Sequence, residues 1–273
     1  MNFWTRTLVA AILTPLAIYV IHMGGWIFQA FIMIFLAFAA WEYLELLNKV
    51  DLRPATILVM VGVFALGISR SIFQFSYSPA FLTLFIFLIA TWHIFQYEKE
   101  DTNPSSDFGA SLSVLLYVGF LGAYLISLRD LPDGKWWTFL TLPSVWIADT
   151  GAYLIGSWIG KRKLAPKTSP HKTWEGYLGG IVFGVLAGIG FLLLYNRVFE
   201  AGLEITILQA GLLALVLSAL SPLGDLTESL IKRTAGEKDS GTIFPGHGGA
   251  FDRIDSMFWT APIAYYLILF IFQ

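Results

Sequence analysis

YLGGIVFGVLAGIGFLLLYNR, residues 177–197, is the apolar run that decides the fold of this chain. A helix needs roughly 20 apolar residues to cross the hydrocarbon core of a bilayer, and this run has that length. Its apolar residues are continuous, whereas strands of a membrane β-barrel alternate polar and apolar side chains. The run therefore predicts a transmembrane helix.

The rest of the chain repeats this pattern. Of its 273 residues, 56% are hydrophobic and only 13% are charged, which is far too apolar for an ordinary soluble domain. We expect an all-α, polytopic integral membrane protein with about nine transmembrane helices. The predicted spans are residues 7–22, 25–47, 55–70, 79–96, 109–128, 137–160, 177–197, 205–223 and 254–272. The first run follows Arg6 without a convincing cleavage site, so we expect it to be retained as a span.

The distribution of Lys and Arg predicts the orientation, because cytoplasmic loops carry an excess of both. With a cytoplasmic N-terminus, 13 of them fall inside and 4 outside, the latter being Arg70, Arg129, Lys135 and Arg197. Both polar loops, 161–176 and 226–252, then face the cytoplasm. We expect residues 1–135 to form N-terminal transmembrane helices and residues 136–273 to form the catalytic transmembrane region that carries these loops.

Composition also excludes several kinds of site and partner. The chain has no cysteine, which rules out disulfides and thiolate metal sites. Its net charge of −2 provides no overall attraction for nucleic acid, and none is expected as a partner.

Aspartates at the ends of predicted spans are the strongest functional signal, because ionised groups near a bilayer usually mark a site. They are Asp149, Asp225, Asp252 and Asp255. On a helix, Asp252 and Asp255 would share a face, as would Asp225 and Ser229. Converging carboxylates without cysteine favour a hard cation, above all Mg²⁺. Alternatively, each aspartate caps a helix or pairs with Arg233 or Arg253.

A glycine-rich turn precedes the last predicted span. It reads Pro245-Gly246-His247-Gly248-Gly249, and its glycines would let backbone N–H groups approach an anion. The cations around it suit a triphosphate that carries Mg²⁺; they are Lys232, Arg233, Lys238 and Arg253. The alternative is a plain connecting loop rich in positive-inside residues.

The loop at 161–176 offers a second set of phosphate-binding groups, in particular Lys167, Ser169 and Lys172. Trp174 either stacks on a base or anchors the chain at the membrane interface. Glu175 is a metal or ribose ligand, or a charge at a helix N-terminus. In the second span, Glu42 either lines a cavity or belongs to an interfacial pair with Trp41.

These motifs resemble the signature of the phosphatidate cytidylyltransferases, also called CDP-diacylglycerol synthases. The family pattern S-x-hydrophobic-K-R, K-D, P-G-H-G-G and D-R-x-D-S is present here from Ser229 through Asp239 to Ser256. Its S-P-x-K-T-x-E-G element is present at 169–176, and a D-x-x-A-Y-like element at 149–153. Ala250 stands where the family has a larger aliphatic residue. The C-terminal half matches closely, and the N-terminal half only as a multi-span region.

The resemblance implies a bacterial cytoplasmic-membrane enzyme that converts phosphatidate and CTP to CDP-diacylglycerol and pyrophosphate, and works as a homodimer. It implies Mg²⁺ and leaves open a second cation such as K⁺. By motif match, Asp225, Asp252 and Asp255 would be the metal and catalytic carboxylates. We expect Lys232, Arg233, Lys238, Arg253 and His247 to contact phosphates. The predicted substrate-binding residues are Lys167, Ser169, Lys172, Trp174, Glu175, Ser229, Asp239, Gly246, Gly248, Gly249 and Asp149.

Three other functions compete with this hypothesis. A cation- or proton-coupled transporter would also carry intramembrane aspartates, but would need no CTP. A CTP-dependent lipid kinase such as a dolichol kinase would transfer the γ-phosphate and release CDP. A membrane scaffold would need none of the aspartates.

Overall fold

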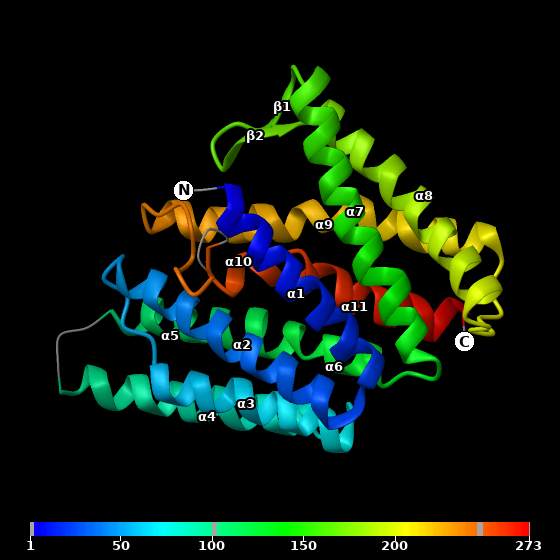
Figure 1. Ribbon diagram of the computed structural model, residues 1–273. Coiled ribbons are helices and arrows are strands. Elements are labelled where there is room, and N and C mark those ends of the chain that lie inside the picture. The colour runs from blue at the N-terminus through cyan, green and yellow to red at the C-terminus, as the bar shows by residue number, and fades with distance from the viewer. Residues whose placement is uncertain (1–2, 100–102, 245–247, 273) are drawn as a thin grey trace. The chain divides into compact units, whose positions relative to one another are not determined.

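The computed structural model describes residues 3–99, 103–244 and 248–272, and helices dominate it (Figure 1). The α-helices are α1 (Phe3–Met23), α2 (Gly25–Asn48), α3 (Thr56–Phe73), α4 (Ser78–Tyr97), α5 (Pro104–Val114), α6 (Tyr124–Arg129), α7 (Gly134–Ile159), α8 (Trp174–Val198), α9 (Ile207–Thr234), α10 (Phe251–Ile254) and α11 (Met257–Leu267). Two π-helical segments, η1 (Leu115–Leu121) and η2 (Ile268–Phe272), continue α5 and α11. Strands β1 (Lys163–Ala165) and β2 (Ser169–Thr173) form an antiparallel hairpin between α7 and α8.

Seven helical stretches of the described chain are long and apolar enough to cross a membrane. They are Gly25–Asn48, Thr56–Phe73, Ser78–Tyr97, Pro104–Arg129, Trp174–Val198, Ile207–Thr234 and Phe251–Phe272. The all-α membrane architecture predicted from hydropathy is thereby confirmed. The two other predicted spans, 7–22 and 137–160, fall on helices α1 and α7. The count of nine and the cytoplasmic N-terminus remain predictions.

The predicted end of the eighth span at residue 223 was wrong. Helix α9 continues to Thr234, so Asp225 lies inside the helix and not at its end. Neither glycine nor proline occurs from Asp225 to Ala235, and hydropathy marks where the apolar run stops but not where the hydrogen-bonding pattern stops. The predicted single helix over 254–272 is also interrupted, because Asp255 and Ser256 form a turn between α10 and α11. Asp252 and Asp255 therefore do not share one continuous helix.

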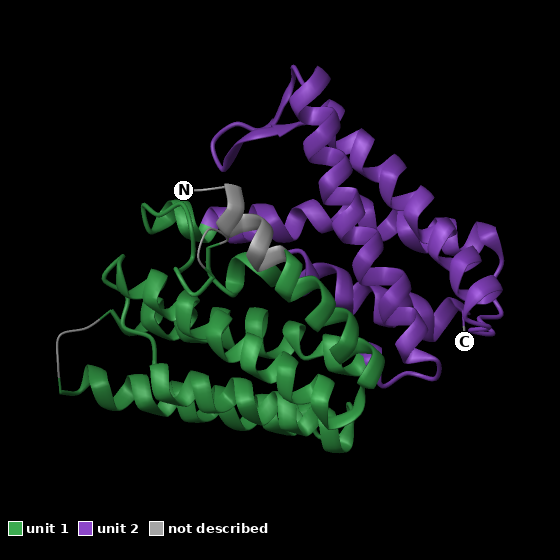
Figure 2. Cartoon of the chain, in the orientation of Figure 1, with its two compact units in different colours: residues 1–127, 231–254 green, residues 128–230, 255–273 purple. Residues whose placement is uncertain are grey.

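The chain divides into two compact units, shown in different colours in Figure 2. Unit 1 contains residues 1–127 and 231–254, and unit 2 contains residues 128–230 and 255–273. The border at 127/128 lies near the division predicted at 135/136. However, the segment 231–254, which carries much of the predicted loop, groups with the N-terminal helices.

In unit 2, helices α7 and α8 lie side by side along their length (Figure 1). Glycines spaced four residues apart on α8 make this contact possible, namely Gly176, Gly180, Gly184 and Gly188. A Cβ at Gly180 would lie 2.8 Å from the carbonyl oxygen of Ala148. Small residues of α7 meet this stripe, because Ala152 and Gly156 lie against Gly176 and Gly180. This tight pairing supports the hairpin β1–β2 that connects the two helices.

Helix α9 has a proline inside it, at Pro222. Proline has no N–H, so the carbonyl oxygen of Ser218 loses its usual helical donor. The hydroxyl of Ser221 donates to that oxygen at 3.4 Å. The helix therefore continues past Pro222 to the aspartate that follows.

In unit 1, the buried face of α2 includes Phe28, Ile32, Leu36, Ala39 and Ala40, and it ends with a buried glutamate, Glu42. Only 4% of Glu42 is exposed. A buried carboxylate is costly unless it accepts hydrogen bonds, so this position requires partners from elsewhere in the unit.

Candidate active site

The carboxylates predicted from the sequence fall into two clusters, one in each compact unit. The unit 2 cluster contains Asp149 from α7, Lys172 from β2, Asp225 from α9 and Asp255 from the turn before α11. The unit 1 cluster is built around Asp252.

In unit 2, Lys172 forms an ion pair with Asp225, and both side chains are largely shielded from solvent. Asp149 and Asp255 each lie close enough to Asp225 and Lys172 to interact with them electrostatically. Three carboxylates and one ammonium therefore share a small, poorly hydrated volume. Repulsion and poor hydration make it costly to ionise all three carboxylates at once, and a bound cation would relieve that cost.

A glycine brings Asp225 close to Asp255. A Cβ at Gly224 would lie 2.7 Å from Cα of Ser256 and even closer to the carbonyl oxygen of Asp255. Helix α9 can therefore approach the turn at 255–256 only because residue 224 has no side chain. Gly224 was not among the predicted site residues, although its position directly before Asp225 was an available signal.

Glu228 is a second residue of this cluster that sequence analysis missed. It lies one turn beyond Asp225 on α9, is 2% exposed, and shares a side-chain hydrogen bond with Asp255. Its i+3 spacing from Asp225 was the available signal.

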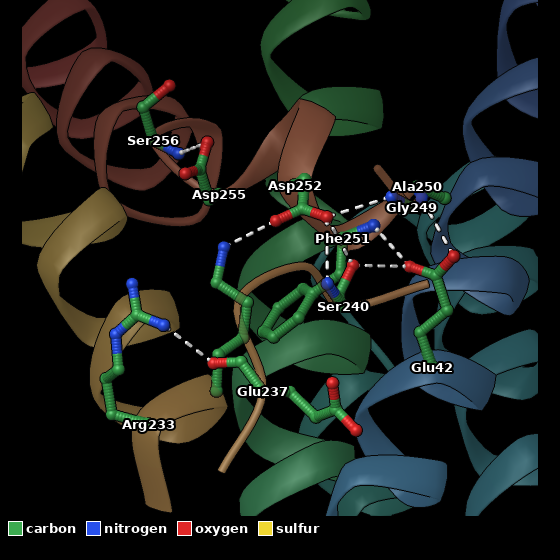
Figure 3. A network of polar contacts seen from close by, with 11 residues as sticks. Glu42, Arg233, Glu237, Ser240, Gly249, Ala250, Phe251, Asp252, Asp255 and Ser256 are labelled. Carbon is green, nitrogen blue, oxygen red and sulfur yellow. Dashed lines mark hydrogen bonds and ion pairs between the residues drawn. The ribbon is translucent and has the colours of Figure 1, made fainter. Parts of the chain in front are cut away.

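In unit 1, Asp252 is held by four donor groups (Figure 3). Its Oδ1 accepts from Nζ of Lys232 at 2.5 Å, and the two side chains are only 10% and 7% exposed. Its Oδ2 accepts from the backbone N–H of Gly249 at 2.8 Å and from the N–H and hydroxyl of Ser240, both at 2.9 Å. Asp252 thus forms a buried ion pair, which is the alternative role considered for these aspartates. Its partner is Lys232 and not one of the two arginines that the sequence suggested.

The backbone N–H groups of the glycine-rich turn bind carboxylates of the chain itself. Gly249 donates to Asp252, while Ala250 and Phe251 donate to Glu42 (Figure 3). The residue at 248 has φ +80°, which a glycine adopts without strain. Gly246 and His247 lie outside the described residues.

The basic hairpin β1–β2 is organised by Glu175. Its carboxylate accepts from the backbone N–H groups of Lys161 at 3.0 Å and Arg162 at 3.2 Å. Thr173 caps α8 by accepting from the N–H of Gly176. Glu175 thus stabilises the hairpin, Lys167 is exposed, and Trp174 is half exposed at the predicted start of the helix.

The remaining predicted residues lie on the surface or are partly covered. Arg233 is exposed and donates from Nη1 to the carbonyl oxygen of Glu237 at 2.9 Å. The others that are exposed are Lys238, Asp239 and Arg253, while Ser169 and Ser229 are partly buried.

The donor set of the unit 2 cluster fits a hard cation, because carboxylate oxygens are the ligands that Mg²⁺ prefers. The ammonium of Lys172 pairs with Asp225 at the position where a metal ion could bind. Among the described residues, however, no group of three or more His, Cys, Asp or Glu side chains has a metal-site arrangement. Of the predicted metal triad, Asp225 and Asp255 lie in unit 2, whereas Asp252 belongs to unit 1.

A pocket of about 330 Å³ in unit 1 contains none of the predicted substrate residues. It is lined by the N-terminal end of α3 and the C-terminal end of α4, with Arg53, Trp92 and Asp107 among its residues. It does not locate the substrates.

Comparison with known proteins extends over nearly the whole chain. The sequence model of the Cytidylyltransferase family matches residues 4–271. A phosphatidate cytidylyltransferase of Synechocystis sp. is 32% identical over 97% of this chain and 96% of its own length. One from Bacillus subtilis is 33% identical over 87% of this chain and 88% of its own. One from Haemophilus influenzae is 45% identical over 46% of this chain and 43% of its own.

The apolar helices and the bacterial relatives together indicate a multi-pass bacterial membrane protein. The resemblance inferred from the motifs is confirmed over both halves of the sequence. With its carboxylate clusters and this match from residue 4 to residue 271, the chain belongs to the cytidylyltransferase family.

Proposed function

We propose that this protein transfers the cytidylyl group of CTP to phosphatidate, giving CDP-diacylglycerol and pyrophosphate for phospholipid synthesis. The observation that carries the proposal is the unit 2 cluster, where Asp149 and Asp255 interact electrostatically with the ion pair of Lys172 and Asp225 in a chain of this family. Relatives that cover nearly the full length carry the name phosphatidate cytidylyltransferase, which supports the same reaction.

The reaction we propose is an in-line displacement. A phosphate oxygen of phosphatidate attacks the α-phosphorus of CTP, and the bond from that phosphorus to the bridging oxygen of the β-phosphate breaks. The electron pair leaves with pyrophosphate. A phosphomonoester has a second pKa of about 6, so the nucleophile is already largely ionised at neutral pH and needs no strong base. The protein must therefore bring two anions together and stabilise the charge that develops.

Asp225 and Asp255 would hold Mg²⁺, with Asp252 as the third predicted ligand and a second cation such as K⁺ beside it. The ion supplies charge neutralisation on the nucleotide phosphates. Lys172, whose ammonium pairs with Asp225 in the structure, would bind phosphate oxygens of CTP. Lys167 and Ser169 of the same hairpin would contribute to that contact, while Arg233, Lys238, Arg253 and His247 would bind phosphates from the other loop.

The finer features of the enzyme belong to the same proposal. We place the N-terminus and both polar loops on the cytoplasmic side of the bacterial inner membrane, in line with the 13 to 4 distribution of Lys and Arg. Phosphatidate would enter from the lipid between helices and present its headgroup at that interface. The working form would be a homodimer.

The test uses purified protein in mixed micelles of detergent and phosphatidate, with CTP labelled at the α-phosphate, and with Mg²⁺ or EDTA. Mg²⁺-dependent label in the lipid phase is the expected result, and Asp225→Asn should abolish it while leaving the protein folded. Asp51→Asn is the matched control, since Asp51 is an exposed turn residue with φ +60° that asparagine tolerates. Transfer of the γ-label in a parallel sample would instead establish a lipid kinase, and no transfer from folded protein would overturn both enzymatic functions.

A further inference from the structure

Glu42 on α2 is buried, yet three donors from a segment about 200 residues further along the chain meet its carboxylate. Its Oε1 accepts from the N–H of Ala250 at 3.0 Å. Its Oε2 accepts from the N–H of Phe251 at 2.9 Å and lies 2.8 Å from the hydroxyl of Ser240. A buried carboxylate that meets three donors forms a structural contact between two segments of the chain, so Glu42 is not an interfacial side chain. The cavity and interfacial roles considered for Glu42 from the sequence are replaced by this one.

Two glycines provide the space that this carboxylate occupies. A Cβ at Gly241 or at Gly249 would lie less than 3.0 Å from carboxylate atoms of Glu42, a distance that real Cβ atoms essentially never show. Gly249 belongs to the turn that the sequence suggested as a phosphate cradle. In the structure, its missing side chain makes room for a carboxylate of the same protein.

Ser240 links Glu42 to Asp252. Its hydroxyl lies 2.8 Å from Oε2 of Glu42 and 2.9 Å from Oδ2 of Asp252. A hydroxyl has one hydrogen to donate, so two ionised carboxylates compete for it. The successive N–H groups at 249, 250 and 251 are divided in the same way, the first to Asp252 and the next two to Glu42. The two carboxylates thus share one set of donors (Figure 3).

We infer that Glu42 is a positioning residue of the active site, which fixes the segment 248–251 and thereby aims the carboxylate of Asp252. The inference rests on the proposed function, because it assigns to the N-terminal half a direct role in building the catalytic segment. Glu42 itself contacts no substrate. Its loss would release two backbone N–H groups and the hydroxyl of Ser240, which then turns entirely to Asp252.

The first experiment compares Glu42→Gln with Glu45→Gln. Glu45 lies on the same helix one turn further on and is exposed, so its substitution is the matched control. Residues that orient a catalytic carboxylate typically change activity by about 10- to 100-fold when replaced. We expect Glu42→Gln to lower kcat by that factor with little change in KM for phosphatidate, and Glu42→Asp to recover part of it. A wild-type kcat for Glu42→Gln would overturn the inference.

A double-mutant cycle tests the steric part. Gly241→Ala should lower kcat in the wild-type background, because its methyl group collides with the Glu42 carboxylate. In a Glu42→Ala background the same methyl group enters vacated space. The kcat of the double variant should therefore lie within about 2-fold of the kcat of Glu42→Ala. Additive effects in the two backgrounds would contradict the proposed contact.

Hydrogen exchange gives a readout that does not depend on activity. In Glu42→Gln, the amides of Ala250 and Phe251 should exchange faster, while amides in the middle of α8 stay as protected as in the wild type. Unchanged protection at both amides would overturn the inference. If the wild-type protein instead showed no cytidylyl transfer, the proposed function would fail, and the exchange data would still decide the role of Glu42.

Discussion

Replacing Gly224 by alanine should separate Asp225 from Asp255 in unit 2 without changing any charge. The new Cβ would lie 2.7 Å from Cα of Ser256, whereas ordinary contact begins at 3.4 Å, so the two segments must separate by at least 0.7 Å. The obstructing atoms are backbone atoms and cannot rotate away. A displacement approaching 1 Å at a reacting site can cost about 100-fold in rate.

The energetic cost of the same substitution is that of overpacking, typically about 1–3 kcal/mol. The protein should therefore remain folded in detergent, with a lowered unfolding temperature. Activity is measured as transfer of α-labelled cytidylyl to phosphatidate in mixed micelles. We expect kcat to fall by one to two orders of magnitude, because Asp225 and Asp255 no longer act on the same small volume.

Gly211→Ala on the same helix is the matched control. Its Cβ would meet side-chain atoms of Ile189 and Val185 at 3.4 Å to 4.0 Å, which is ordinary contact, and alanine favours the helix by up to about 1 kcal/mol. This variant should keep wild-type activity. Near-normal turnover in Gly224→Ala, or equal loss in both variants, would refute the argument that the close approach of α9 to the turn at 255–256 builds the site.

Three other predictions follow from single contacts. Lys232→Met leaves Asp252 without its buried cation and should destabilise unit 1 by about 1–3 kcal/mol. This is less than the largest cost of breaking a buried ion pair, because the other donors to Asp252 remain. Thermal unfolding measures the loss, and an unchanged transition temperature would contradict the prediction. Glu175→Gln weakens the contacts that close the basic hairpin, so trypsin should cut there faster at an unchanged unfolding temperature; equal cleavage rates would refute this role. Gly180→Val forces α7 and α8 apart and should lower the free energy of unfolding by about 1–3 kcal/mol or more. Gly190→Ala places its methyl group in open space and should leave the free energy of unfolding unchanged. Similar stability of the two variants would show that the glycine stripe is unnecessary.

Hydropathy predicted the helices well where the chain changes abruptly from apolar to polar. The predicted span 177–197 corresponds to α8, Trp174–Val198, within a few residues. It failed at α9, where the helix continues through the polar residues 224–234, because backbone hydrogen bonds continue after the apolar run has ended. It also missed the break at Asp255, since both sides of the turn are apolar enough to look like one helix.

The motif residues were found from the sequence, but several of their roles were not. Motif spacing singled out Asp225, Asp252 and Asp255 as a group, whereas the structure gives Asp252 a partner set in unit 1 and leaves Asp225 paired with Lys172. Spacing along the chain reports which residues share a helix face. It does not report which lysine from a distant hairpin reaches which carboxylate.

The membrane-spanning helical architecture and the chemistry of the polar segments could be predicted from the amino-acid sequence, because bilayer thickness and side-chain type act on local runs of residues. The contact of Glu42 with the glycine-rich segment, and the close packing at Gly224 and Gly249, became visible only in the folded structure. Such pairings depend on contacts between residues far apart in the sequence, where a missing Cβ on one segment admits a carboxylate or a backbone from another.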